Sequence, residues 1–317
     1  MVQISIGKDD SGCRIDRILR KRLPLKSLSE IYSLIRKGKI LVDGKRVKQN
    51  FRVQESNLIS LYVDQSEIAQ KRNPDQKLRN IVKTDFYKRN FSILYEDNYL
   101  LACNKPSGLV VHPGTGHLNG DTLIELASGY LFEKGVLSNE SEPALVHRID
   151  RDTSGIILIA KNKSILRNLH DIFRSRDIIK EYIAICHHKP PKFEDEIILG
   201  ISKSHNLKKG TKMRVRSDGQ QTRSRYRVVQ YQNDISRVEV FLETGKTHQI
   251  RVQMAHIGAP IVGDNRYGDS EADNRVLKFS PNRLYLHAFK LSFIHPVKKN
   301  KLTIVARQPE EFSDLIK

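Results

Sequence analysis

The stretch His147-Arg148-Ile149-Asp150-Arg151-Asp152-Thr153-Ser154-Gly155 is followed directly by the apolar run Ile156-Ile157-Leu158-Ile159-Ala160. The apolar run predicts a buried strand, because short runs of aliphatic and β-branched residues bounded by turn residues pack inside sheets. Two carboxylates and two guanidinium groups thus lie directly before a buried strand. Charged side chains at such a junction are more plausibly directed into a cleft than into open solvent. A structural network of ion pairs would have the same composition. The residues alone therefore leave catalysis and structure as alternatives.

On both sides of this stretch, residues 91–317 have the pattern of a mixed α/β domain. Helical stretches are expected after Asp121, from Ser164 to Phe173 and from Thr247 to His256. Strand-like runs, besides the one already quoted, are FSILYEDNYLLACN (91–104), KEYIAIC (180–186), SRVEVFLE (236–243) and LYLHAFKLSF (284–293).

The N-terminal segment is strongly basic and predicts two short helices. Residues 14–52 hold 13 Lys or Arg against three Asp or Glu. Ile15, Ile18 and Leu19 recur at helical spacing, and residues 31–35 repeat the pattern after the break at Pro24. The polar faces of both helices would be basic. A charged face that is merely solvated is the alternative to a binding surface.

A small hairpin is expected after the second helix. Residues 39–42 alternate as a strand, Asp43-Gly44 supplies a turn, and residues 58–63 continue as strand. Residues 64–90 are polar, lack apolar periodicity and contain the turn-favouring pair Asn73-Pro74, so they predict a linker. We therefore expect an N-terminal module over 1–66, a linker over 67–90 and a second domain over 91–317.

Bulk composition points to a polyanionic partner. The 317 residues include 55 Lys or Arg and 36 Asp or Glu, a formal charge of +19. Such an excess favours phosphate backbones or anionic membranes, and the absence of a basic amphipathic membrane helix or a long apolar run favours nucleic acid. The N-terminus lacks the pattern of an export signal, and three widely spaced cysteines argue against disulfides and a cysteine zinc site. We expect a cytoplasmic monomer that does not bind membranes.

Three segments of the N-terminal module carry a family resemblance. CRIDRILRKRL (13–23), SEIYSLIRKGKILVDGKRV (29–47) and NLISLYV (57–63) resemble the S4 RNA-binding domain. The resemblance implies that the module binds RNA through its basic side chains. The candidate RNA-binding residues in this module are Arg14, Arg17, Arg36, Lys37, Lys39, Lys45 and Arg46.

The stretch HRIDRDTSG (147–155) resembles the HRLD-x-x-TSG signature of the RluA family of pseudouridine synthases. Ile149 stands where Leu is usual, and Asp152 falls on a variable position. Supporting motifs follow in the same order as in the family, at 93–114, at KEYIAIC, at LETGKTHQIRVQMAHIGAPIVGDNRYG (242–268) and at LHAFKLSFIHP (286–296). The resemblance implies an α+β fold, with the S4-like helix-hairpin module followed by a mixed, largely antiparallel sheet.

The same resemblance implies the site residues and the chemistry. Asp150 is expected as the nucleophile, Arg251 as the cation beside it and Tyr182 as the active-site tyrosine. Arg148 is expected to fill the stack that a flipped uridine vacates, whereas an ion pair with Asp150 or with a phosphate is the alternative from the residues alone. Lys246 replaces the arginine common in this block. Pseudouridine formation needs no metal or coenzyme, because the base is only detached, turned and rejoined. Addition of Asp150 to C1′ and removal of a C2′ proton remain alternative routes.

The predicted substrate is structured RNA, with large-subunit (23S) ribosomal RNA favoured because the family members acting on it look most similar. Transfer RNA is one alternative. A non-catalytic S4-type protein that binds ribosomal RNA during assembly and a metal-dependent nuclease are the others.

Gly245-Lys246-Thr247 is not a P-loop, since Val240 stands where that motif needs glycine. His147 with Asp150 and Asp152 lacks the accompanying ligands of a metal site, and the scattered histidines are interpreted as packing or hydrogen-bonding residues rather than ligands. His248 is among them.

Overall fold

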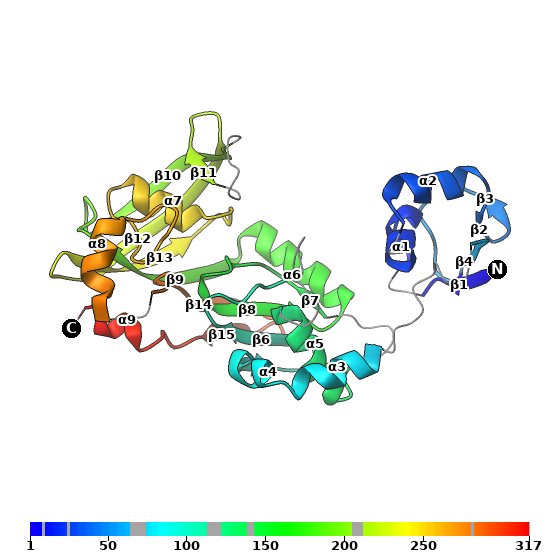
Figure 1. Cartoon of the computed structure of the whole chain (residues 1–317), viewed down its shortest axis with the longest axis horizontal. Helices are drawn as coiled ribbons and strands as arrows, with labels where there is room; N and C mark the ends of the chain where they lie inside the picture. Colours follow the sequence, from blue (N-terminus) through cyan, green and yellow to red (C-terminus); the bar gives the residue numbers. More distant parts are fainter. Residues whose placement is uncertain are drawn as a thin grey trace. The chain divides into compact units, whose positions relative to one another are not determined.

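The computed structural model describes residues 1–7, 10–23, 26–63, 74–112, 122–137, 143–204, 212–279 and 282–316. The chain forms two compact units, one of residues 1–80 with 131–142 and the other of residues 81–130 with 143–317 (Figure 1). The predicted linker region 67–90 contains α3 (Pro74–Val82) and α4 (Asp85–Asn90). Within the described ranges, the helices are too short or too polar to cross a membrane.

The first unit contains the two helices and the hairpin that the sequence predicts. Its four strands form an antiparallel sheet in the order β1-β4-β2-β3. Pairing of the N-terminal strand with β4 was not predicted. The elements are β1 (Val2–Ser5), α1 (Ile15–Arg22), α2 (Leu28–Arg36), β2 (Ile40–Val42), β3 (Lys45–Arg46) and β4 (Leu58–Leu61).

Local sequence accounts for these elements. Helix α2 begins with a capping box in which the Ser27 hydroxyl accepts from the Glu30 N–H and the Glu30 carboxylate accepts from the Ser27 N–H. Asp43 and Gly44 both have positive φ (48° and 74°), as a two-residue hairpin turn requires. The fully buried Ile31 packs with the apolar residues of α1 and the sheet in one core.

The second unit is built on an 11-stranded sheet whose main path runs β11-β10-β12-β13-β9-β14-β8-β6-β5. Every pairing is antiparallel except that of β14 with β8, so the mixed, largely antiparallel sheet is confirmed. The strands are β5 (Ile93–Glu96), β6 (Leu100–Lys105), β7 (Ala144–Leu145), β8 (Ser154–Ala160), β9 (Ile178–His187), β10 (Glu194–Lys203), β11 (Met213–Val215), β12 (Gln220–Gln232), β13 (Ile235–Leu242), β14 (Leu286–Ile294) and β15 (Lys301–Val305).

Each predicted helix is present, but helices also form where none was predicted: α3 and α4 in the expected linker, and two short additions near the C-terminus. The predicted helical stretches correspond to α5 (Leu123–Glu133), α6 (Lys163–Ser175) and α7 (Gln249–His256). The additions are α8 (Ser270–Val276), followed by a 3₁₀ turn η2 (Leu277–Phe279), and α9 (Glu311–Asp314). The predicted strands are confirmed, whereas no strand was predicted for β7, β10, β11, β12 or β15.

The apolar run 156–160 lies at the centre of the core. All seven residues of β8 are buried, as the sequence predicts. Its alternate side chains Ile156 and Leu158 share a core cluster with residues of β6, β14 and α6. The loop that carries Asp150 is thus joined directly to the most buried strand of the sheet.

Strand register brings three distant segments together at the start of β8. Tyr182 on β9 pairs with Ala288 on β14, and Ala288 pairs with Gly155 on β8. Gly155 has a φ of 112°, and a Cβ atom there would lie 2.3 Å from the Ala288 carbonyl oxygen. Only glycine allows this approach. The end of the loop 147–153 therefore lies two strands from Tyr182.

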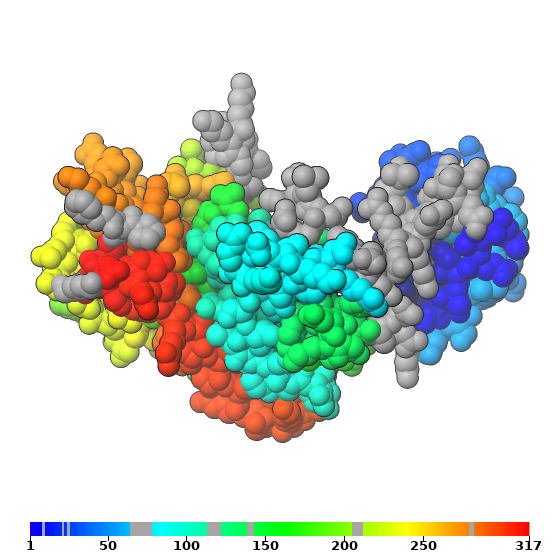
Figure 2. All heavy atoms as spheres, turned by 60° about the horizontal axis from the view of Figure 1, so that its bottom comes forward, coloured from blue at the N-terminus to red at the C-terminus, as the bar shows by residue number. Residues whose placement is uncertain are grey.

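The C-terminal residues support the same region. Figure 2 shows them in red at the surface of the second unit, next to the yellow segment, and Gln230 donates a hydrogen bond to the Ile316 carbonyl (2.9 Å). Arg283 joins α9 to β8, because its guanidinium bonds both the Glu311 carboxylate (2.6 Å) and the Ser154 hydroxyl (2.6 Å).

Candidate active site

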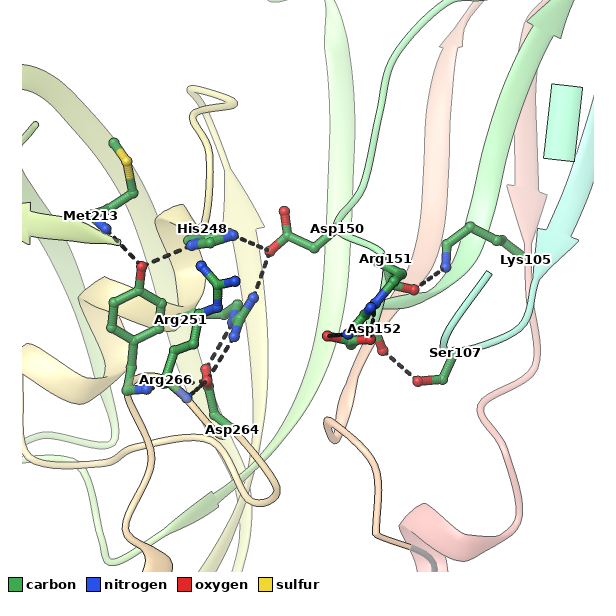
Figure 3. A network of polar contacts seen from close by, with 11 residues as sticks. Lys105, Ser107, Asp150, Arg151, Asp152, Met213, His248, Arg251, Asp264 and Arg266 are labelled. Carbon is green, nitrogen blue, oxygen red and sulfur yellow. Dashed lines mark hydrogen bonds and ion pairs between the residues drawn. The ribbon is translucent and has the colours of Figure 1, made fainter. Parts of the chain in front are cut away.

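Asp150 and Arg251 meet in the second unit although 101 positions separate them in the sequence. Arg251 lies in the first turn of α7, and its Nη1 donates to Asp150 Oδ2 at 3.2 Å (Figure 3). The Asp150 side chain is 25% exposed, whereas that of Arg251 is 6% exposed. The carboxylate is thus accessible to a ligand on one side and held by a buried cation on the other.

A second carboxylate fixes the guanidinium. Arg251 Nε and Nη2 donate to the two oxygens of Asp264 at 2.8 and 2.7 Å, and Asp264 also accepts from the backbone N–H groups of Arg266 and Tyr267. Burial acts to raise the pKa of Asp264, but the bonds from Arg251 hold it below its usual value. Burial opposes the charge on Arg251, yet Asp264 and then Asp150 raise its pKa overall. The pair stays charged, and its two parallel bonds fix the direction of the guanidinium.

Tyr182 lies on the same part of the sheet and is 9% exposed. Burial raises the pKa of its hydroxyl, and the negative charge of Asp150 raises it further. Tyr182 remains protonated near neutral pH and presents a ring and a hydroxyl donor.

The loop that carries Asp150 is attached to the end of β6. Lys105 is fully buried, and its ammonium donates to the carbonyl oxygens of Pro106 (2.8 Å), Leu109 (2.8 Å) and Arg151 (2.6 Å). The Ser107 hydroxyl donates to the Asp152 carbonyl at 2.6 Å. Burial lowers the pKa of Lys105 to about 7 against the attraction of the nearby aspartates. Three carbonyl oxygens match the three donors of an ammonium, so we assign the charged form at neutral pH and below.

Replacing Lys105 by Met should destabilise the second unit by about 3 kcal/mol or more, because three carbonyl groups at a buried position lose their donor. The free energy of unfolding from urea titration measures this. Lys192→Met is the matched control, since Lys192 is an exposed lysine that pairs with Asp195. Its effect should stay within about 0.5 kcal/mol. Equal stability of the two variants would contradict a structural role for the Lys105 ammonium.

Arg151 and Asp152 of the signature point away from this site. In Figure 3 Asp150 points toward Arg251, whereas Arg151 and Asp152 point away and pair with each other at 2.9 Å. Arg148 is exposed, and within the described ranges it has no hydrogen bond or ion pair, with Asp150 or any other residue. Lys246 is also exposed. Of these residues, only Asp150 is directed into the network with Arg251 and Asp264.

Besides Asp264, two residues that the sequence analysis did not assign to the site contact it. His248, interpreted there as a packing or hydrogen-bonding residue, has Nε2 3.9 Å from Asp150 Oδ2 and Nδ1 2.8 Å from the Tyr267 hydroxyl. The Arg251 guanidinium lies 5.3 Å from the centroid of the Tyr267 ring. The signal in the sequence was their place within the block 242–268, which also supplies Arg251 and Asp264.

The basic residues predicted in the first unit are all exposed. The basic N-terminal surface consists of Arg14, Arg17, Arg36, Lys37, Lys39, Lys45 and Arg46. Arg14 is partly neutralised by Asp16 at 2.6 Å. The Arg46 guanidinium lies over Gly38, where a Cβ atom would come within 2.7 Å of it.

A hollow of about 450 Å³ adjoins this surface. Its rim includes Lys45, Arg46 and Lys48, and the half-exposed ring of Phe51 also lines it. Phe51 was not singled out in the sequence. Cations beside an aromatic ring form a surface suited to phosphates and unstacked bases.

A metal-binding group is not found in the described part of the chain, where no three His, Cys, Asp or Glu side chains are grouped to hold an ion. An accessible carboxylate, a buried guanidinium and a protonated tyrosine together suit attack on, or proton removal from, an electrophilic sugar.

Comparison with known proteins identifies the two units. The RNA pseudouridylate synthase profile matches residues 99–256, which include Asp150, Tyr182 and Arg251, and the S4 domain profile matches residues 13–59. Ribosomal large subunit pseudouridine synthase C of Buchnera aphidicola subsp. Schizaphis graminum is 36% identical over 96% of this chain and 92% of its own length. The protein of the same name from Vibrio cholerae is 34% identical over 96% of this chain and 92% of its own length.

Solved structures share the fold. Human RNA Pseudouridylate Synthase Domain Containing 4 superposes with a TM-score of 0.56 at 24% identity, over 78% of this chain and 96% of that one. Human RNA Pseudouridylate Synthase Domain Containing 1 gives 0.55 at 23% identity, over 69% of this chain and 84% of that one. With the sequence relatives, these findings show that the chain belongs to the RNA pseudouridylate synthase family, carries an S4 domain, and is an RNA pseudouridine synthase, an isomerase.

Proposed function

We propose that this chain converts specific uridines of large-subunit ribosomal RNA to pseudouridine, with Asp150 as the reacting carboxylate. The observation that carries the proposal is the pairing of the accessible Asp150 with the buried Arg251, itself held by Asp264. The ribosomal substrate is supported by the names of relatives that are 34–36% identical over nearly the whole chain.

The reaction balances within the substrate. The bond between C1′ and N1 breaks, N1 gains a proton, a bond from C1′ to C5 forms, and the proton on C5 leaves. Asp150 can assist by adding to C1′ or by taking the C2′ proton, and both routes need an ionised carboxylate next to the ribose. Arg251 favours that form, because a nearby cation offsets the desolvation of the carboxylate.

Tyr182 and Arg148 have proposed roles in holding the extruded uridine. A uridine within a helix must leave its stack to expose C1′ and C5, which costs a few kcal/mol. The protonated Tyr182 offers a ring face to the uracil and a hydroxyl donor near Asp150. Arg148 is exposed two residues before Asp150, and its planar guanidinium suits the vacated stack.

The experiment that tests the function is tritium release from C5-labelled uridine in RNA, with excess chelator present. Tritium should appear in water in step with pseudouridine when the substrate is 23S ribosomal RNA, and transfer RNA should release less. Binding of intact RNA without release would instead indicate a non-catalytic S4 protein. Strand cleavage that stops with chelator would indicate a nuclease.

Deleting residues 1–66 should weaken binding to long ribosomal RNA and flatten its salt dependence. Each phosphate neutralised contributes about 0.7–0.9 to the slope of log K against log salt, and this segment carries the basic N-terminal surface. The rate at saturating RNA should persist, since Asp150, Tyr182 and Arg251 lie in the second unit. Filter binding between about 50 and 200 mM salt measures the slope.

A full-length control separates charge from loss of the module. Exchange of Lys37, Lys39 and Lys45 for Gln keeps the core of the module, because all three side chains are exposed. The slope should fall by roughly 2 to 3 with folding unchanged. An unchanged slope in both variants would show that the basic N-terminal surface does not contact RNA.

A further inference from the structure

His248 occupies an unusual backbone position beside Asp150. It precedes α7 with φ 55° and ψ 22°, in the left-handed region, and its side chain makes no capping hydrogen bond to the helix. Residues other than glycine are uncommon in this region, where Asn, Asp and His are the most frequent of them, and strained backbone positions cluster at functional sites. The backbone instead directs the imidazole toward Asp150, as Figure 3 shows.

Hydrogen-bond directions determine which imidazole nitrogen carries the proton. The backbone N–H of Met213 donates to the Tyr267 oxygen at 2.9 Å, so this oxygen acts as an acceptor there. The Tyr267 hydroxyl proton then has His248 Nδ1 as its acceptor at 2.8 Å, and in the described ranges it has no other. Burial raises the pKa of Tyr267, which keeps that proton in place. Nδ1 is thus the acceptor, and Nε2 bears the hydrogen.

The Nε2–H group faces the same carboxylate oxygen that Arg251 contacts. His248 Nε2 lies 3.9 Å from Asp150 Oδ2, and Arg251 Nη1 lies 3.2 Å from it. Asp150 Oδ1 has no hydrogen bond or ion pair with any residue in the described ranges. Burial lowers the pKa of His248, opposed by Asp150, so the imidazole is neutral near pH 7 and donates from Nε2 alone.

We propose that His248 is a positioning residue whose Nε2–H, oriented by Tyr267, donates to Asp150 Oδ2 and leaves Oδ1 to react with the ribose. The inference rests on the proposed role of Asp150. Catalytic hydrogen bonds are often long before substrate binds and shorten in the substrate complex, and the 3.9 Å separation allows this closure. Two donors on one oxygen limit rotation of the Asp150 carboxylate about its side-chain bond. A single contact with the guanidinium leaves that rotation free.

The charged and titratable neighbours of His248 come from four segments. Asp150 lies in the loop before β8, Arg251 in α7, and the others in the loop after α7 or directly before β11. These others are Asp264, Arg266, Tyr267 and Lys212. Tests of pH dependence must therefore leave the charged members of this set unchanged, as substitutions of His248 and of the neutral Tyr267 do.

Two substitutions of His248 separate the donor from the bulk of the side chain. Asn tolerates the left-handed region and reaches as far as Nδ1, so His248→Asn keeps the backbone and loses the donor to Asp150. Gln places its amide near the position of Nε2, so His248→Gln restores a donor. His188→Asn is the matched control, because His188 also has a positive φ (63°) but contacts Asp234.

We expect His248→Asn to lower the single-turnover rate at saturating RNA by about 10- to 100-fold, the effect of losing one hydrogen bond to a charged group. RNA affinity should change by less than about twofold, and the acid limb of the pH–rate profile should move to higher pH, because the carboxylate has lost a donor. His248→Gln should recover most of the rate, and His188→Asn should match the wild type. Tyr267→Phe, which removes the orienting hydroxyl, should shift the acid limb in the same direction with a smaller loss of rate.

Three results would overturn the proposal. One is a His248→Asn rate near that of the wild type with an unmoved acid limb. Another is a folded His248→Gln variant no faster than His248→Asn. The third is a Tyr267→Phe variant with the wild-type rate and pH–rate profile. Because this variant leaves His248 unchanged, it tests the proposal even if His248→Asn fails to fold. A wild-type chain that forms no pseudouridine would contradict the proposed function. The three results above would contradict only the role of His248, so the two failures are distinct.

Discussion

Asp150→Asn should abolish pseudouridine formation, lowering the single-turnover rate by at least about 10⁴-fold, because the amide keeps the shape of the side chain but removes the reacting carboxylate. Fold and RNA affinity should be retained, since Asp150 is partly exposed and its loss leaves Arg251 paired with Asp264. Tritium release under single-turnover conditions and the melting temperature measure the two effects.

Asp152→Asn is the matched control for this prediction. Asp152 belongs to the same signature, but its side chain is 41% exposed and pairs with Arg151 at the surface. Its rate should stay within about threefold of the wild type. An Asp150→Asn variant within about tenfold of the wild type would rule out Asp150 as the reacting group.

Arg251→Met should lower turnover by about 10³-fold or more and reduce stability as well. Two effects combine, because Asp150 loses the cation that favours its ionised form and the buried Asp264 loses both guanidinium bonds. The acid limb of the pH–rate profile should move to higher pH, since the carboxylate then accepts a proton more readily. Binding of RNA should weaken much less than turnover.

Arg251→Lys distinguishes charge from geometry. Lysine keeps the positive charge but cannot form the two parallel bonds to Asp264. Its acid limb should lie near that of the wild type, while its rate should be intermediate between the wild type and Arg251→Met. Equal losses of RNA affinity and turnover in Arg251→Met would instead indicate that Arg251 contacts a phosphate.

Short-range sequence patterns were sufficient for the elements that depend on neighbouring residues. The capping box at Ser27 and Glu30 and the turn at Asp43-Gly44 are local hydrogen-bond and backbone requirements, so α2 and the hairpin were predictable. Strand β8 was predictable because a continuous apolar run is buried on both faces. The pairing of Asp150 with Arg251 was expected only from the family resemblance, and the structure shows the contact.

Strand β12 was not predictable from hydrophobic alternation. Its buried face begins with the polar Thr222 and Ser224 before Tyr226 and Val228, so only part of the strand alternates apolar with charged residues. The buried hydroxyls are satisfied by partners from other segments. Gln253 of α7 accepts from Ser224 and donates to Thr222.

The sequence by itself determined the two-part organisation and the basic character of the first part. Its signature at 147–155 identified the family and proposed Asp150 as the reacting residue. Only the tertiary structure decided that Lys105 holds the Asp150 loop, that Asp264 orients Arg251 and that Tyr267 determines the proton position on His248. Each of these depends on side chains from distant segments meeting in a buried place. Residue spacing predicts which face of an element is apolar, whereas contacts between elements and the resulting charge states follow from how the whole sheet pairs and packs.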